Sequence, residues 1–237
     1  MKYRIKSLAS AASLLGLCLL APASRAASIN FVIDPDPTTS GSISFAGIPF
    51  VSPLVGSGIE VDALFGFSTP ANDGTILNCM GCLLDFETGP FLAGDSNGWL
   101  FAAGGSISIT GGVDLPSGPD IPAGSTLLSG TFSNFVVSLE LLSDPDAFIG
   151  LTAGELLDSK SPLLVDFFGL PAGSAFHGAL LIDFVGLGSA PGPFVSLVVG
   201  EGLVLNEAIP VPESNSLTLL VIGLCTLLAF RFMRRVA

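Results

Sequence analysis

The chain has 237 residues, about half of them hydrophobic, and a formal net charge of −12 at pH 7. So high an apolar content excludes an intrinsically disordered chain, and so negative a chain does not attract nucleic acid or an anionic membrane surface. Seven of the eight basic residues lie near the two ends, which leaves Lys160 alone against nineteen acidic residues (twenty less Glu213) in the body between them.

Residues 1–26 are typical of a secretory signal peptide. Lys2, Arg4 and Lys6 precede an apolar run over residues 8–20, and a small-residue cleavage site follows. Leu17, directly before Cys18, is too large for a lipobox, so lipidation is not expected. We therefore expect the body to be exported into an oxidising compartment.

The exported body, residues 27–207, is long enough for one domain with a substantial core. Short apolar or alternating segments separated by Gly, Pro, Asn and Asp predict an all-β fold, an antiparallel β-sandwich or jelly-roll-like domain. A β-solenoid is the weaker alternative, because no repeat of fixed period occurs. The strands are expected at 28–33, 42–45, 48–51, 58–65, 83–86, 99–103, 106–110, 126–132, 135–142, 163–170, 175–185 and 194–205.

Local signals within the body predict two hairpins and one helix. Gly104-Gly105 separates two expected strands, as does Ser133-Asn134, and both spacings are typical of hairpin turns. Residues 152–159 are predicted to be helical, because Thr152 as N-cap and Glu155 three residues later form a capping box.

The end of the chain predicts a membrane helix. A linker over residues 208–216 contains Pro210 and Pro212, and an apolar run without charge covers residues 217–230. The basic terminus follows, with Arg231, Arg234 and Arg235. We predict one transmembrane helix over residues 217–235, with the arginines in the cytoplasm and the body outside.

This tail resembles the PEP-CTERM sorting signal of exported proteins of Gram-negative bacteria. The resemblance rests on Val211-Pro212-Glu213-Ser214 followed by the apolar helix and the basic terminus, although the family usually has Pro where this chain has Ser214. It implies processing by an exosortase, a membrane protease/transpeptidase. It also implies transient or permanent inner-membrane anchoring and a final place on the cell surface or in the extracellular matrix. Residues 104–132 also look like a stretch that recurs among such proteins.

Cys79 and Cys82 are the two cysteines of the body, and export favours a disulfide between them. A redox site needs a helix start that is absent around them, and a zinc site needs two further ligands. Cys225 lies in the predicted membrane helix, where we interpret it as a small apolar filler.

Acidic residues occur in pairs separated by one residue, an arrangement that puts both carboxylates on one face of a strand about 7 Å apart. Such pairs suit Ca²⁺ or a glycosidase acid and base, although solvated strand faces and turns are the favoured interpretation. The weak calcium candidates are the loop pairs Asp34, Asp36, Asp144 and Asp146, and no other metal or cofactor is expected. The remaining pairs are Glu60/Asp62 and Asp85/Glu87.

Other residues that could build a catalytic or sugar-binding site are scarce. His177 is the single histidine, no G-x-S-x-G motif occurs, and Trp99 is the single tryptophan, while the phenylalanines follow strand periodicity and are expected in the core. The sequence therefore predicts a non-enzymatic protein of the cell surface or of an exopolysaccharide matrix, with an exosortase-like enzyme, the inner membrane and extracellular polysaccharide as partners. The alternatives are a calcium-dependent adhesive module and a secreted, carboxylate-dependent glycan hydrolase.

Overall fold

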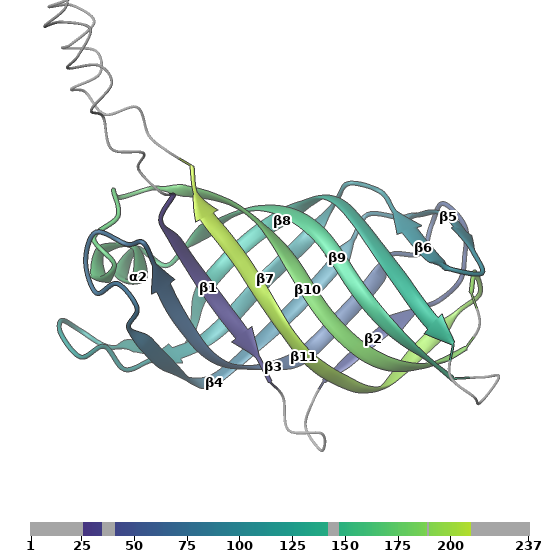
Figure 1. The fold of residues 1–237 in the computed structure, drawn as a ribbon, viewed down its shortest axis with the longest axis horizontal. Helices are drawn as coiled ribbons and strands as arrows, with labels where there is room; N and C mark the ends of the chain where they lie inside the picture. The colour runs from purple at the N-terminus through teal and green to yellow at the C-terminus, as the bar shows by residue number, and fades with distance from the viewer. Residues whose placement is uncertain (1–25, 35–40, 142–146, 189, 210–237) are drawn as a thin grey trace, which may run out of the picture.

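The fold is that of a computed structural model (Figure 1). The structure describes residues 26–34, 41–141, 147–188 and 190–209. Most of the predicted signal peptide, the V-P-E-S segment and the predicted C-terminal helix lie outside these ranges. Within the ranges, no helix combines the length and the apolar character needed to cross a membrane.

Eight antiparallel strands form a closed barrel. Hydrogen-bonded neighbours follow one another in the order β8, β7, β4, β3, β1, β11, β10 and β9, and β9 pairs again with β8. The circuit is complete within residues 28–208, so none of these eight strands is left as a free edge over its whole length. The eight strands are β1 (Ser28–Ile33), β3 (Leu54–Phe67), β4 (Ile76–Thr88), β7 (Gly104–Val113), β8 (Ile121–Leu141), β9 (Ala147–Lys160), β10 (Ala175–Gly188) and β11 (Phe194–Ala208).

Three shorter strands and one helix complete the described fold. Strand β2 (Ser42–Phe45) pairs with β3 on one side and with β11 on the other. Strand β1 pairs with the same two strands at other positions along them. The hairpin of β5 (Phe91–Asp95) and β6 (Gly98–Phe101) adds to β8. Helix α2 (Pro162–Phe167) lies at the end of the barrel where β11 ends, and β5 and β6 lie at the opposite end (Figure 1).

The predicted all-β, antiparallel class is confirmed, but eight strands close into one barrel where the sequence suggested a β-sandwich or a jelly-roll-like domain. Alternation of polar and apolar residues is expected in both arrangements. It does not show whether the two edge strands of a sheet pair with each other and close a barrel. Several strands of the barrel are long, and β8 alone has 21 residues. Strands β1 and β2 have the predicted bounds.

Five local predictions were wrong. The expected helix at 152–159 is part of strand β9, and the expected strand at 163–170 is largely helix α2 with the turn after it. The two hairpins do not form, because Ser133-Asn134 lies at a bulge inside β8 and Gly104 begins a strand that does not pair with β6. The segment 48–51 is a turn.

Phenylalanine rings and one indole fill the barrel. Trp99 lies 4.6 Å from Phe194 and 5.3 Å from Phe148, measured between ring centroids, and Phe184 stacks on Phe194. Each fully buried aromatic side chain stabilises the fold by roughly 1.5–3 kcal/mol through removal of apolar surface from water. The interior therefore forms an apolar core, with most polar side chains on the outside.

Candidate functional site

A depression with several polar side chains lies on the outer face of the barrel. This groove has a volume of about 560 Å³ and crosses β3, β1, β11, β10 and β9 near the end that carries α2. Its side chains, here called the outer groove, are Ser28, Asn30, Phe65, Phe67, Glu155, His177, Ala179, Leu205 and Glu207.

Strand register builds the groove in rows across the sheet. Ser28 is the partner of Phe67 on one side and of Glu207 on the other, and Glu207 is the partner of His177. Ala179 is in turn the partner of Glu155. Because directly paired residues share a face, these side chains all point away from the core.

The groove offers an apolar wall beside fixed polar groups. Phe67 is 53% exposed, which corrects the expectation that the phenylalanines belong to the core. Asn30 is held in place because its Nδ2 donates to Ser28 Oγ at 2.9 Å and its Oδ1 accepts from the Asn206 backbone N–H at 3.0 Å. The exposed side chains of the groove include an aromatic ring, Phe67, and two polar groups, His177 and Glu207. Such a surface suits a neutral polar ligand with one apolar face, such as a sugar ring.

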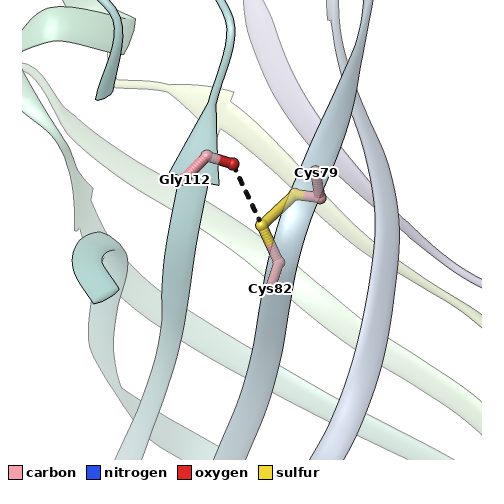
Figure 2. The surroundings of a disulfide bond; sticks show 3 residues. All are labelled: Cys79, Cys82 and Gly112. Carbon is pink, nitrogen blue, oxygen red and sulfur yellow. Dashed lines mark hydrogen bonds between the residues drawn. A yellow bond between two sulfur atoms is a disulfide. The ribbon is translucent and has the colours of Figure 1, made fainter. Parts of the chain in front are cut away.

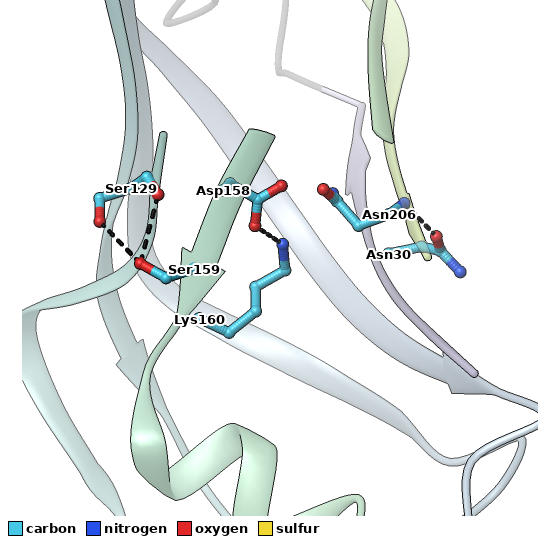
Figure 3. A network of polar contacts seen from close by, with 6 residues as sticks. All are labelled: Asn30, Ser129, Asp158, Ser159, Lys160 and Asn206. Carbon is cyan, nitrogen blue, oxygen red and sulfur yellow. Dashed lines mark hydrogen bonds and ion pairs between the residues drawn. The ribbon is translucent and has the colours of Figure 1, made fainter. Parts of the chain in front are cut away.

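A second polar cluster lies inside the barrel (Figure 3). Asp158 and Lys160 project inward from β9 and form an ion pair with fully buried side chains. The Lys160 ammonium lies 4.5 Å from the ring centroid of Phe176, a cation–π distance. The second Asp158 carboxylate oxygen and the Asn206 side-chain amide have no hydrogen-bond partner among the described residues, and Figure 3 shows these two groups facing one another.

Burial dominates the electrostatics of this pair. It lowers the pKa of Lys160 to about 8, against the opposing effect of the Asp158 charge. It raises the pKa of Asp158, again against the effect of its partner. Both directions mean that the charged forms lose more from desolvation than they gain from each other.

The rest of the described surface is acidic without a compensating base. Lys160 is the one Lys or Arg in the described ranges, and its side chain is buried, whereas the described carboxylates other than Asp158 are at least partly exposed. A bound anion would therefore find no exposed Lys or Arg among these residues, which favours neutral or cationic ligands.

The predicted carboxylate pairs are placed as follows. Glu60 and Asp62 lie on the outward side of β3, and Asp85 and Glu87 are exposed on β4. The Asp85 carboxylate accepts hydrogen bonds from Ser57 Oγ and from the Gly58 N–H, so it holds a bulge between β3 and β4.

Of the four calcium candidates, only Asp34 is among the described residues. Asp36, Asp144 and Asp146 lie outside them. The Asp34 N–H donates to Asp62 Oδ2 at 2.8 Å, which brings together members of two predicted pairs. The described residues contain no group of three or more His, Cys, Asp or Glu side chains arranged to hold a metal ion.

Cys79 and Cys82 are joined by a disulfide within β4 (Figure 2). Their Cα atoms are 5.5 Å apart, and the bridge spans a register shift of β4 against β7 at which Gly81 has φ of 60°. Cys82 Sγ lies 3.6 Å from the Gly112 carbonyl oxygen, and a side chain at Gly111 would overlap it. The bridge therefore fixes a bulge of the barrel wall.

The sequence did not predict the outer groove. It did single out one of its residues, His177, as the single histidine of the chain. Ser28, Asn30, Phe67 and Glu207 carry no motif, and their proximity depends on β1 pairing with both β3 and β11. The alternation of residues 58–65 was the available signal that the neighbouring side chains of β3 face outward. The chain matches no protein-family model, no curated protein and no solved structure.

Proposed function

We propose that this chain is an exported, non-enzymatic protein of the cell surface or of an exopolysaccharide matrix, whose outer groove binds a neutral polysaccharide. Residues 1–26 direct export, and the tail with Val211–Ser214 and the helix 217–235 anchors the protein in the inner membrane until an exosortase-like enzyme processes it. This proposal for the tail rests on the sequence and on its resemblance to PEP-CTERM signals.

The observation that carries the binding proposal is the exposed Phe67 ring beside the polar row Ser28, Glu207 and His177. An open groove on the outer face admits a polymer that continues beyond both ends of the contact. An acidic surface without an exposed Lys or Arg in the described ranges repels polyanions, which is why a neutral chain is the expected ligand.

Affinity electrophoresis of the exported body in gels that contain either a neutral glucan or a uronate polymer tests the binding proposal. We expect retardation by the neutral polymer alone, and at least tenfold weaker retardation for Phe67→Ala. Leu197→Ala is the matched control, since Leu197 is 57% exposed but lies outside the groove. Equal mobility of wild type and Phe67→Ala in every gel would remove the groove from the proposal.

Sorting is tested separately, by the intact mass of the native protein in inner-membrane, outer-membrane and medium fractions. We expect loss of the tail near Pro212-Glu213 and recovery of the body at the outer surface or in the medium. A full tail confined to the inner membrane would identify the helix as a permanent anchor and would contradict the matrix role.

A calcium-dependent adhesive module is the second candidate. The Asp34 backbone N–H donates to Asp62 Oδ2, which places these two acidic residues close together. Calorimetry of the body should then show saturable Ca²⁺ binding that Asp62→Asn weakens, with Asp166→Asn as a control on an exposed carboxylate elsewhere. A flat titration at millimolar Ca²⁺ would end this alternative. An activity screen on the same polysaccharides addresses the remaining candidate, a glycan hydrolase.

A further inference from the structure

Three polar side chains, Asp158, Lys160 and Asn206, are buried together inside the barrel (Figure 3). One carboxylate oxygen of Asp158 and both polar side-chain atoms of Asn206, Oδ1 and Nδ2, have no hydrogen-bond partner among the described residues. Buried polar groups in folded proteins are nearly always hydrogen-bonded. A buried amide without a partner beside an ion pair therefore calls for an explanation.

Strand register brings Asn206 toward the ion pair on β9. Asn206 is the partner of Gly178 on β10, and Gly178 is the partner of Leu156 on β9. Asp158 and Lys160 follow Leu156 on the same, inward face of β9. Gly178 has no side chain, and the Asn206 amide lies close to it, since a Cβ atom at Gly178 would be 2.7 Å from Asn206 Oδ1. The space over Gly178 is therefore open to the Asn206 amide, which Figure 3 shows facing Asp158.

The rings around Lys160 place its amine near β11. Lys160 Nζ lies 4.5 Å from the ring centroid of Phe176 on β10 and 5.8 Å from that of Phe31 on β1. Strand β11 lies between β10 and β1. Val204 is the β11 partner of Phe31 and shares the inward face with Asn206, two residues further on. The amine thus ends between the two strands that flank Asn206, on the side of the wall where the amide lies (Figure 3).

The surroundings suit a reaction between this amine and this amide. Burial lowers the pKa of Lys160 and raises the pKa of Asp158, which favours transfer of a proton from the ammonium to the carboxylate. A neutral amine is a nucleophile, and a carboxylic acid can supply a proton to a leaving group. The Phe31 and Phe176 rings are fully buried, so the site excludes the water that would compete with the amine.

We propose that Lys160 and Asn206 form an intramolecular isopeptide bond, with Asp158 as the catalytic acid and base. Lys160 Nζ bonds to Asn206 Cγ, and the bond between Cγ and Nδ2 breaks. Asp158 takes one proton from the attacking amine and gives one to the leaving nitrogen, which departs as ammonia. One amide replaces another, so the step needs no oxidant or cofactor. The separate side chains in Figure 3 are those of the chain before this reaction.

The bond ties β9 to β11 across β10. It closes residues 160–206, which contain α2 and β10, into a covalent loop. A cross-link of this kind restricts the unfolded chain as a disulfide does, and reduction does not break it. The single lysine of the body then serves as one end of a permanent cross-link inside the barrel.

Trypsin digestion of the native full-length protein, unfolded in urea and reduced, tests the bond together with its intact mass. Trypsin cuts after a free lysine but not after one whose amine is acylated, and Lys160 is the single Lys or Arg between Arg25 and Arg231. We expect one fragment that spans residues 27–209. We also expect the intact protein to be lighter by one ammonia than its sequence with one disulfide requires.

Variants assign the roles of the three residues. Asn206→Ala removes the amide and Asp158→Leu removes the catalyst, so both proteins should keep their full mass and be cut at Lys160. Asn134→Ala is the matched control, because Asn134 is exposed on β8, and it should keep the bond. The emission of buried Trp99 checks that each variant is folded.

Three results would overturn the proposal. The first is a wild type of full mass that trypsin cuts at Lys160. The second is resistance at Lys160 that Asn206→Ala retains, which would assign the amine to another partner. The third is a protein lighter by one ammonia but still cut at Lys160, which would indicate an asparagine cyclised onto its own backbone. None of these results bears on polysaccharide binding in the outer groove, so the two proposals fail separately.

Discussion

The buried pair of Asp158 and Lys160 predicts that the exported body, while Lys160 is a free amine, becomes more stable as the pH rises from about 8 to about 10.5. Lys160 has a pKa near 10.5 in the unfolded chain and about 8 in the folded protein. Between these values the unfolded state holds the proton and the folded state has released it. Unfolded protein therefore binds more protons, and the free energy of unfolding must rise with pH.

The size of the effect follows from the same two pKa values. At about 1.4 kcal/mol per pH unit, the rise from pH 8 to pH 10.5 amounts to roughly 3 kcal/mol. Residues 27–209 contain no tyrosine, no arginine and no other lysine, and their two cysteines form the disulfide, so no other side chain titrates in this range. Urea denaturation of residues 27–209 with Asn206→Ala, which keeps Lys160 a free amine, is followed by Trp99 emission at several pH values and measures the slope.

A double variant provides the control for this measurement. Asp158→Leu/Lys160→Met removes both charges, so its free energy of unfolding should not change between pH 8.5 and 10.5. A stability of the Asn206→Ala body that falls over this range would mean that the ion pair stabilises the charged lysine more than burial disfavours it. That result would refute the assignment of burial as the dominant effect.

Three further changes test the packing. Phe194→Ala should lower the free energy of unfolding by about 3–5 kcal/mol in urea denaturation, because four aromatic rings pack around Phe194, and exposed Val195→Ala should have little effect. Gly154→Ala should cost about 1–3 kcal/mol, since the added methyl overlaps the Phe135 ring, and a loss no larger than that of exposed Ala153→Ser would contradict this packing. Cys79→Ser/Cys82→Ser should cost no more than about 2 kcal/mol, because the closed loop is only four residues long, and a global loss of the fold would show that the bulge nucleates the barrel.

Local patterns in the sequence predicted the strand class well, because alternation of polar and apolar side chains survives wherever one face is buried. Residues 28–33 and 42–45 match strands β1 and β2, and the alternation of residues 58–65 lies within β3. Long strands were divided at polar pairs such as Ser133-Asn134, which here form a bulge instead of a turn. Bulge and turn share the same residue types, so only pairing with β9 distinguishes them.

The outer groove and the inner ion pair were not predictable in the same way. Their residues come together through the order of strands around the barrel, in particular through β1 between β3 and β11. A single sequence has no local signal for pairing between strands that are far apart in the chain. Phe67 and Phe50, both exposed, were assigned to the core because exposure of a phenylalanine has no local signature. The disulfide was predictable because Cys79 and Cys82 are the two cysteines of the body and export favours their oxidation.

Strand β9 contains residues 152–159, for which the capping-box pattern of Thr152 and Glu155 predicted a helix. Its outward side chains include the exposed residues Ile149, Leu151 and Leu157, while its inward positions include Gly150, Thr152, Gly154 and the ion pair. Phe148 and Leu156 also face inward, so hydrophobicity hardly distinguishes the two faces, and a slip of one residue would reverse the two sets. Side-chain volume decides instead: the Phe184 and Phe135 rings occupy the space over Gly150 and Gly154, where any larger residue would overlap them. The register of β9 is thus set by where rings fit against glycines, and the two charged residues are carried inward with it. The inward Lys160 then meets Asp158 and the Phe176 ring, which is why a barrel with an acidic surface keeps its one lysine inside.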